Sequence, residues 1–237
     1  MAVMISGKWA LVTGASRGVG QQIALGLAGR GVNLVIQSRD IENQAATMAL
    51  LEGKGVKVLQ VAADLENPES ISAMAIRAED LSGGIDILYN NAAIMTQYLS
   101  LFDVPAEDYH RSFQVNVYAV IQLCNYFAPR MKARGFGRII NTTSGIKDTP
   151  HLDAYSITKA ALDKYTRDLA VELGNTGVLA NLFDPGWCRT DLGGPEAWND
   201  VSSVIPGALL PAMLAKTGDE EPRAMLFAAQ DYAGIDI

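Results

Sequence analysis

Residues Trp9–Gly31 read WALVTGASRGVGQQIALGLAGRG and predict a strand, a glycine loop and a helix in direct succession. In this order of elements, backbone N–H groups and the positive end of the helix bind a phosphate. Gly14, Gly18 and Gly20 permit a tight turn and a close approach of the backbone to the anion. Glycines also occur in turns that bind nothing, but the strand before them and the helix after them favour a phosphate site.

The alternation of strand and helix continues along the chain. Apolar runs predict further strands at Val32–Gln37, Val56–Ala62, Ile85–Tyr89, Arg138–Asn141, Leu179–Phe183 and Ala224–Ala228. Helical patterns cover Glu42–Gly53, Pro68–Leu81, Ala106–Met131 and Asp153–Leu173. Alternating strands and helices are joined by right-handed crossovers, which produces a parallel sheet. We therefore predict a single Rossmann-like α/β domain over residues 1–237, with a doubly wound, mostly parallel sheet and helices on both faces.

The composition is that of a compact globular protein, with 49% hydrophobic and 19% charged residues. A formal charge of −7 argues against nucleic acid and anionic membranes as partners. Cys124 and Cys188 lie far apart without metal-ligand spacing, so we expect reduced thiols and no metal. The N-terminus lacks a signal-peptide pattern, and no apolar run approaches the ~20 residues of a membrane span. We expect a cytoplasmic protein.

Ser38, Arg39 and Asp40 follow the second predicted strand. In dinucleotide-binding folds an acid at this place binds the ribose hydroxyls of NAD, whereas a cation accommodates the 2′-phosphate of NADP. Ser38 takes the place of the acid, Arg39 follows it, and Arg17 adds a second positive charge. The pattern favours NADP(H) over NAD(H). The alternative is a solvated Arg39–Asp40 pair that binds no ligand.

Polar residues also close the third and fourth strands. At Asp64–Leu65, the carboxylate can accept a hydrogen bond from an adenine amino group or cap the next helix. The asparagines of Asn90–Ala93 can bond the backbone on both sides, and a structural use is favoured. Asn116 lies inside a predicted helix, where asparagine competes with the backbone hydrogen bonds. Its presence indicates a local distortion or a bound water.

The run RIINTTSGIKDTPHLDAYSITK, Arg138–Lys159, combines a hydroxyl cluster at a strand end with a helix. Tyr155 and Lys159 are four residues apart and therefore project from one helix face. A phenol has a pKa near ~10, and a neighbouring ammonium lowers it. Ser144 can hold a substrate oxygen while Tyr155 exchanges a proton with it. The Tyr-Lys spacing alone is common on helix surfaces, but every motif above falls at the carboxyl end of a strand, where such sheets bind ligands.

Together these motifs resemble the short-chain dehydrogenase/reductase family, of the single-domain type. The resemblance is carried by TGASRGVG, Asp64–Leu65, NNAA, the asparagine of QVNVYAV, the serine-tyrosine-lysine stretch and PGWCRT at Pro185–Thr190. It implies that Tyr155 is the catalytic acid/base and that Lys159 binds the nicotinamide ribose and lowers the pKa of Tyr155. It also implies that Ser144 positions the carbonyl and that Asn116 holds a water in a proton relay.

The resemblance also implies a set of residues around the cofactor. Together with the polar residues at the ends of the predicted strands, they make up the predicted cofactor site: Gly14, Ser16, Arg17, Gly18, Val19, Gly20, Ser38, Arg39, Asp64, Leu65, Asn90, Tyr155, Lys159, Pro185, Gly186 and Thr190.

Three departures from the family pattern bear on these expectations. The usual serine-to-tyrosine spacing selects Thr142, whereas counting along the strand selects Ser144, which we prefer because the strand fixes where a side chain points. Ala93 stands where the family usually has glycine. The C-terminus lacks the paired glycines of the family's last strand, which puts the usual tetramer contact in doubt and leaves a homo-oligomer open.

We therefore expect an NADP(H)-dependent oxidoreductase that interconverts a ketone or aldehyde and the corresponding alcohol. Alternatives are an NADP-sensing regulator without chemistry, and a nucleotide-sugar epimerase or dehydratase. The complete set of Ser144, Tyr155 and Lys159 argues against the first, and the lack of room for a separate substrate domain argues against the second.

Residues of about 190–215 are rich in Gly, Pro, Trp and Ser and predict a flap over the substrate. Packing of this segment on the sheet edge is the alternative. An apolar substrate pocket would be lined by Met95, Ile146, Trp187, Leu192 and Trp198, although ordinary packing would also explain each of them. His151 precedes Tyr155 on a loop and is a further candidate for substrate contact, with a solvated loop histidine as the alternative.

Overall fold

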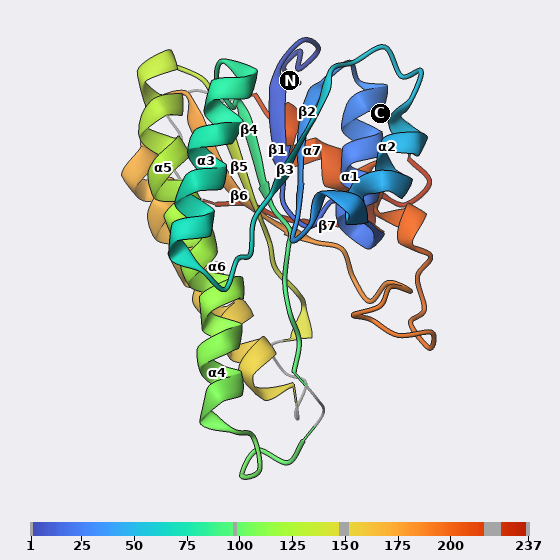
Figure 1. The fold of residues 1–237 in the computed structure, drawn as a ribbon, viewed down its shortest axis with the longest axis vertical. Coiled ribbons are helices and arrows are strands. Elements are labelled where there is room, and N and C mark those ends of the chain that lie inside the picture. The colour runs from blue at the N-terminus through green and yellow to red at the C-terminus, as the bar shows by residue number, and fades with distance from the viewer. Residues whose placement is uncertain (1, 97–98, 147–151, 216–223, 236–237) are drawn as a thin grey trace.

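The computed structural model describes residues 2–96, 99–146, 152–215 and 224–235, except for the side chain of Asp153. Within these residues one seven-stranded sheet has the order β3-β2-β1-β4-β5-β6-β7, and all neighbouring strands are parallel. The strands are β1 (Trp9–Val12), β2 (Asn33–Ser38), β3 (Val58–Ala62), β4 (Ile87–Asn90), β5 (Gly137–Thr142), β6 (Val178–Asp184) and β7 (Leu226–Ala228). The predicted parallel α/β sheet is confirmed (Figure 1).

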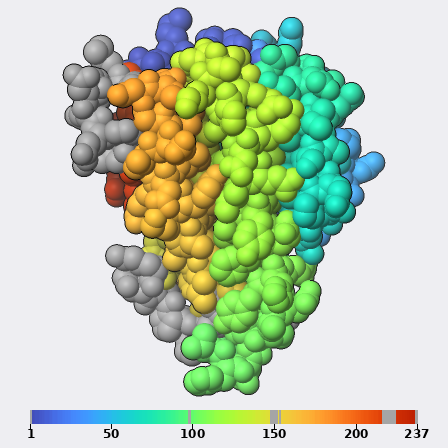
Figure 2. All heavy atoms as spheres, turned by 90° about the vertical axis from the view of Figure 1, so that its left-hand side faces the viewer, coloured from blue at the N-terminus to red at the C-terminus, as the bar shows by residue number. Residues whose placement is uncertain are grey.

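Helices cover both faces of this sheet. One face carries α1 (Gly18–Gly29) and α2 (Ala45–Leu51). The other carries α3 (Pro68–Ser82), α5 (Ala119–Arg134) and α6 (Asp153–Leu173), which lie side by side in Figure 2. None of the described helices is both long and apolar enough to span a membrane.

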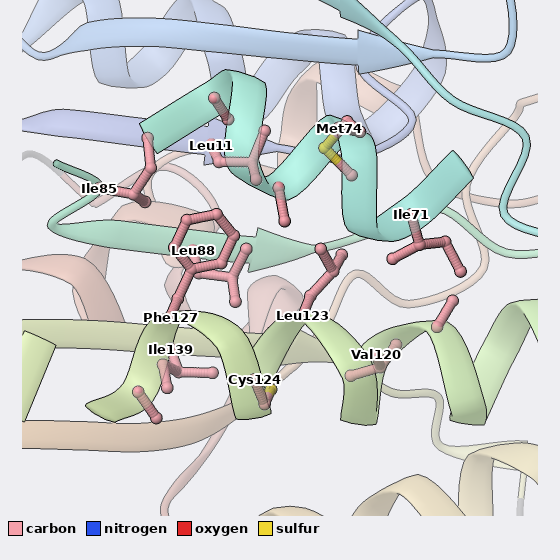
Figure 3. Packing of buried hydrophobic residues seen from close by; sticks show 14 of the residues in the cluster. Leu11, Ile71, Met74, Ile85, Leu88, Val120, Leu123, Cys124, Phe127 and Ile139 are labelled. Atoms are coloured by element: carbon pink, nitrogen blue, oxygen red, sulfur yellow. The ribbon is translucent and has the colours of Figure 1, made fainter. Parts of the chain in front are cut away.

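Alternation along the strands produces two cores, because successive side chains of a strand point to opposite faces. Leu11 of β1 belongs to the core under α3 and α5, while its neighbour Val12 belongs to the core under α1. In Figure 3, strand residues such as Leu88 meet Met74 of α3 and Phe127 of α5. Full burial of each large apolar side chain contributes about 1.5–3 kcal/mol to folding. Together, these two cores hold the strand ends in place.

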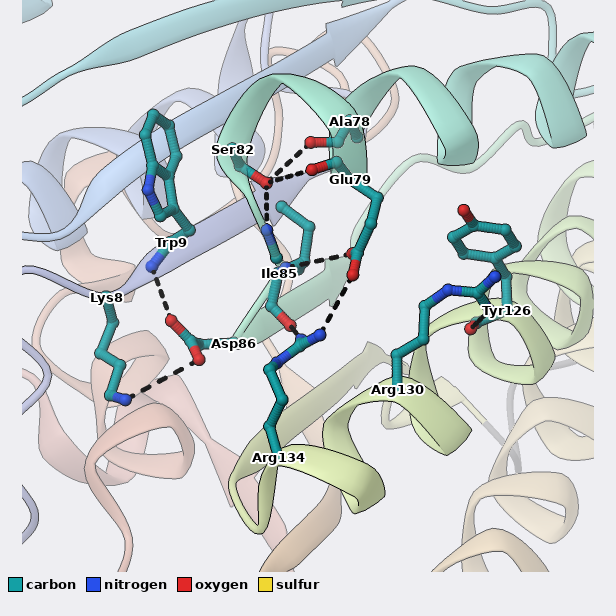
Figure 4. Close-up of polar contacts among 11 residues, drawn as sticks. Lys8, Trp9, Ala78, Glu79, Ser82, Ile85, Asp86, Tyr126, Arg130 and Arg134 are labelled. Atoms are coloured by element: carbon teal, nitrogen blue, oxygen red, sulfur yellow. Dashed lines mark hydrogen bonds and ion pairs between the residues drawn. The ribbon is translucent and has the colours of Figure 1, made fainter.

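Polar contacts fix the amino-terminal edge of the sheet (Figure 4). Asp86, just before β4, accepts a hydrogen bond from the backbone N–H of Trp9 at 3.1 Å. Arg134 at the end of α5 bonds Glu79 of α3 at 3.1 Å and also the backbone oxygen of Ile85. These contacts lie at the end of the strands opposite to the glycine loop, so they leave the carboxyl ends free for a ligand site.

The predicted helix Ala106–Met131 is one helical rod with a distortion inside it. The structure has α4 (Ala106–Phe113), a π-helical segment at Gln114–Tyr118 and then α5. Asn116 is the middle residue of the π-helical segment, which confirms the distortion expected from an asparagine at this position. The predicted helix Glu42–Gly53 is shorter, with a 3₁₀ segment at Ile41–Gln44 before α2.

The second half of the segment predicted as a flap contains short helical elements. Short helical turns at Val201–Val204 and Gly207–Leu209 are followed by α7 (Leu210–Met213). Val204, Leu209 and other residues of this part are buried in the core under α1. From Val204 onward the segment thus packs into the core, as the alternative expected, and the flap over residues of about 190–215 stays a prediction.

Candidate active site

A cavity of about 1700 Å³ lies at the carboxyl ends of the strands. Its walls come from the glycine loop after β1, the ends of β2 and β3, and the loops after β4, β5 and β6. Pockets for one small ligand typically measure about 300–1000 Å³. The cavity therefore has room for a dinucleotide together with a small substrate.

The glycine loop forms a cradle that larger residues would fill. Gly14 has a φ of +65°, and a Cβ there would lie 2.9 Å from the Cα of Ala92. A Cβ on Gly20 would lie only 2.3 Å from the backbone oxygen of Gly14. Arg17, the N-cap residue of α1, makes no side-chain cap hydrogen bond. The first turn of α1 thus meets the cavity without a side-chain cap, an arrangement that suits an anion.

Residues after β2 form the wall at one end of the cavity. Gln37, Ser38 and Arg39 all line it. Gln37 accepts a hydrogen bond from the backbone N–H of Gly14 at 3.0 Å and donates one to the backbone oxygen of Ala63 at 2.9 Å. Gln37 was not foreseen as a site residue, because a glutamine inside an apolar strand carries no binding pattern of its own. It joins the ends of three strands.

Ser144, Tyr155 and Lys159 line the same cavity as the glycine loop. Tyr155 is 9% exposed and Lys159 only 4%. The ammonium of Lys159 lies 5.4 Å from the centre of the Tyr155 ring and donates a hydrogen bond of 2.7 Å to the backbone oxygen of Thr142. The helix spacing of tyrosine and lysine thus places both groups at the end of β5.

Burial is the largest cause of the pKa shifts of Tyr155 and Lys159. Burial and, after it, the negative charge of Asp184 raise the pKa of Tyr155 above its ordinary value. Burial lowers the pKa of Lys159 to about 8, against the opposing effects of Asp163 and Asp184. In the protein without ligands, the pKa of Tyr155 therefore lies above its ordinary value, because burial disfavours the charged phenolate. That Lys159 lowers this pKa stays a prediction.

Comparison with known proteins agrees with this geometry. The family model of short chain dehydrogenases matches residues 8–199, which include the glycine loop and the tyrosine-lysine pair. The chain belongs to the short-chain dehydrogenase family.

Relatives of this short-chain dehydrogenase are similar over most of its length. The chain is 36% identical over 188 residues to dehydrogenase/reductase SDR family member 4 of Bos taurus, covering 78% of this chain and 67% of that protein. A metagenomic short-chain oxidoreductase solved in complex with NADP is 29% identical, with a TM-score of 0.79 over 95% of this chain and 98% of that one. L-sorbose reductase from Gluconobacter frateurii, solved with NADPH and L-sorbose, is 33% identical, with a TM-score of 0.75 over 81% and 73%.

Most of the cofactor residues predicted for the dehydrogenase line the cavity. Those that do are Gly14, Ser16, Arg17, Gly18, Val19, Gly20, Ser38, Arg39, Asp64, Leu65, Tyr155, Lys159, Pro185, Gly186 and Thr190. Asn90 is the exception: its side chain is buried in the interior and donates a 2.8 Å hydrogen bond to Asn141 of β5. Asn91 lines the cavity instead, because the next residue along the chain faces the other way.

Asn116 does not line the cavity of the dehydrogenase. Its side-chain oxygen accepts a hydrogen bond from the backbone N–H of Ile94 at 2.9 Å, and its amide donates to the backbone oxygen of Ile94 and to Thr158. The water-holding role implied by the resemblance stays a prediction. Asn116 anchors the segment after β4 to α6.

Asp184, the last residue of β6, lines the dehydrogenase cavity and was missed. Asp184 directly follows the predicted strand Leu179–Phe183, but an aspartate before Pro-Gly is typical of a turn, so no binding role was assigned to it. The backbone N–H of Gly186 donates a 2.8 Å hydrogen bond to its carboxylate. The available signal was the same one that singled out the other site residues, a charged group at the carboxyl end of a strand.

The five residues expected to form an apolar pocket, Met95, Ile146, Trp187, Leu192 and Trp198, all line the cavity. The rings of Trp187 and Trp198 pack edge to face, 5.2 Å apart. His151 lies outside the described residues. Among the residues described, no group of three or more His, Cys, Asp or Glu has the arrangement of a metal site.

Proposed function

We propose that this dehydrogenase interconverts a ketone or aldehyde and the corresponding alcohol with NADP(H), and that Tyr155 is the acid/base. The observation that carries the proposal is the meeting of Ser144, Tyr155 and Lys159 with the glycine loop in one cavity. A bound nicotinamide dinucleotide would supply or accept the hydride. The chain itself would orient the substrate and move the proton. The apolar walls around Trp187 suit a substrate with an apolar part.

Ser144 is the better candidate to hold the substrate oxygen. Thr142 also lines the cavity, but its hydroxyl is buried and has no hydrogen-bond partner among the described residues. Ser144 lies two residues beyond the end of β5 and lines the cavity. In reduction, Tyr155 would donate a proton to the oxygen held by Ser144; in oxidation it would take that proton back. Lys159 would stabilise the phenolate that forms when the proton leaves.

Substitution of Tyr155 by phenylalanine tests the catalytic assignment. Proton transfer by a positioned side chain is worth typically ~10²–10⁴-fold in rate, so turnover of a ketone with NADPH should fall by this factor. Cofactor binding should be retained. The exposed Tyr118 on the π-helical segment provides the matched control, because Tyr118→Phe removes the same oxygen from a residue that does not line the cavity. Near wild-type turnover by Tyr155→Phe would refute the assignment.

The residues of the cavity fit a dinucleotide, and the two arginines favour one with a 2′-phosphate. The uncapped start of α1 and the close glycine contacts suit the pyrophosphate. Arg17 and Arg39 line the cavity beside Ser38, whose short side chain leaves no acid to repel a phosphate. The NADP(H) bound to the two solved relatives supports the same preference.

Arg39→Asp tests the cofactor preference. The thermal shift produced by NADP should fall below that produced by NAD, because an acid favours ribose hydroxyls and repels a phosphate. An unchanged order of the two shifts would show that Arg39 does not read the phosphate. Lys57→Asp, an equal change of charge at an exposed position before β3, should leave the order as it is.

A further inference from the structure

The chain just beyond β5 is held from two sides at Thr143, the residue between Thr142 and Ser144. On one side, the backbone N–H of Thr143 donates a 2.8 Å hydrogen bond to the backbone oxygen of Phe183 in β6. On the other side, the Thr143 hydroxyl donates a hydrogen bond to a carboxylate oxygen of Asp163 in α6. Thr143 is only 3% exposed, so its hydroxyl would lose solvation without such a partner.

Asp163 continues the row of side chains that carries the proton-transfer pair. Tyr155, Lys159 and Asp163 follow one another at intervals of four residues, which places them on successive turns along one side of α6. Lys159 donates a 2.7 Å hydrogen bond to the backbone oxygen of Thr142. One turn further along the helix, Asp163 accepts the bond from Thr143. Two neighbouring residues at the end of β5 are therefore bonded to two successive turns of α6.

Asp163 itself lies behind the cavity wall. It is not one of the described residues that line the cavity, whereas Thr143 is. The second carboxylate oxygen of Asp163 lies 4.0 Å from the guanidinium of Arg167, whose side chain is 64% exposed. An ion pair of this length to an exposed side chain contributes little. The hydrogen bond to Thr143 is therefore the contact that links this carboxylate to the cavity.

This contact determines where Ser144 lies. Ser144 directly follows Thr143 and lines the cavity. Hydrogen bonds to a charged acceptor are roughly twice as strong as neutral ones, so the carboxylate holds Thr143 firmly against α6. Without that bond, the backbone bond to β6 would hold Thr143 from one side alone, and the hydroxyl of Ser144 would be free to shift. A displacement of about 1 Å in a catalytic group can cost ~10²-fold in rate.

We propose that Asp163 is a positioning residue of the reaction: it accepts the Thr143 hydroxyl and thereby holds the Ser144 hydroxyl at the substrate oxygen. The proposal rests on the proposed function, because it gives Asp163 its effect through Ser144. Neither the proposed reaction nor the predicted cofactor site assigns a role to Asp163 or Thr143.

The first experiment removes the donor of the bond. Thr143→Val keeps the shape of the side chain but lacks the hydroxyl, so kcat for reduction of a ketone with NADPH should fall by up to ~10²-fold. The thermal shift produced by NADPH should stay near that of the native protein. Thr143→Ser retains a hydroxyl and should recover most of the lost kcat. All rates are measured below the melting transition of each variant, so loss of folded protein does not contribute to them.

A double-mutant cycle shows whether the effect passes through Ser144. In the Ser144→Ala background, Thr143→Val should cause no further fall in kcat, because the group that the bond positions is already missing. A bond that only stabilises the fold would lower the melting temperature in both backgrounds and leave kcat unchanged. Native kcat in Thr143→Val, or equal falls in kcat in the two backgrounds, would overturn the proposal.

The second experiment changes the acceptor of the bond. Asp163→Asn and Asp163→Ala both remove the charge, but only asparagine keeps an oxygen that can accept from Thr143. We expect kcat to fall further in Asp163→Ala than in Asp163→Asn, and the two to become equal in the Thr143→Val background. Asp168→Ala, which breaks an exposed ion pair with Lys164 on the same helix, should keep native kcat. Equal kcat in the two Asp163 variants, or a difference that persists without the Thr143 hydroxyl, would contradict the proposal.

Tyr155→Phe, measured in the same assay, separates this proposal from the proposed function. Near-native turnover in Tyr155→Phe would refute the proposed function. Loss of turnover in Tyr155→Phe together with native kcat in Thr143→Val would refute the positioning role of Asp163 alone.

Discussion

An ion pair crosses the mouth of the cavity and should weaken binding of a 2′-phosphate. Arg17 of the glycine loop lies 2.8 Å from Asp191, in the segment after β6, and both side chains line the cavity. If Arg17 binds the 2′-phosphate, the phosphate must displace Asp191 from Arg17 or share Arg17 with it. Asp191→Asn removes the competing charge and leaves the size of the side chain unchanged. We expect this variant to bind 2′-phosphorylated nucleotides more tightly than the native protein.

The exposure of the pair limits the size of the gain. The side chains of Arg17 and Asp191 are 68% and 74% exposed, so solvent screens their attraction. Exposed ion pairs are worth ~0.2–1 kcal/mol, and each ~1.4 kcal/mol is a factor of ten in affinity. The affinity should therefore rise by roughly 1.4- to 5-fold. The gain should shrink with added salt, since the screening length falls from ~30 Å at 0.01 M to ~10 Å at 0.1 M.

Titration calorimetry with adenosine 2′,5′-bisphosphate and with AMP measures this effect, because the two probes differ only in the 2′-phosphate. At low salt, Asp191→Asn should bind the bisphosphate more tightly and change the affinity for AMP less. Asp168→Asn is the control, since it breaks an exposed ion pair of the same kind with Lys164 on α6. Equal gains for both probes, or no gain for the bisphosphate, would refute the argument. In the Arg17→Gln background the substitution of Asp191 should have no effect.

Two further predictions follow from close contacts in the structure. Gly20→Ala should cost about 1–3 kcal/mol and weaken dinucleotide binding, because its Cβ would lie 2.3 Å from the backbone oxygen of Gly14. Gly29→Ala on the same helix meets nothing within 4 Å and should leave the melting temperature unchanged or raise it, so equal melting temperatures for the two variants would contradict the close-packing argument. Asn116→Ala should destabilise the protein by roughly 1–3 kcal/mol, because it leaves partly buried backbone groups of Ile94 unpaired. Thermal unfolding tests this against Asn125→Ala, an exposed position on α5, and similar values for the two would show that Asn116 is no anchor.

The order of the strands and helices could be predicted from the sequence, because the patterns that mark strands and helices involve only residues close together in the chain. Apolar runs interrupted by Gly, Asn and Asp mark strands, and helical periodicity marks the connections between them. A parallel sheet follows from the alternation, and with it the meeting of strand ends at one edge. This is why Tyr155 and Lys159, distant in the chain from the glycine loop, were correctly expected in the same cavity.

Only the tertiary structure decided the properties that depend on how deeply a side chain is buried and on which way it points. Asn90 and Asn91 are neighbours of the same residue type, yet only Asn91 lines the cavity, because the side chain of Asn90 points into the core and bonds Asn141. The pKa of Tyr155 is raised although a lysine is adjacent, because burial makes the largest contribution to it. Asp184 lines the same cavity as Tyr155 and Lys159 only because β6 pairs with β5. Local patterns specify the elements, whereas solvation and contacts between distant segments arise only when those elements pack together.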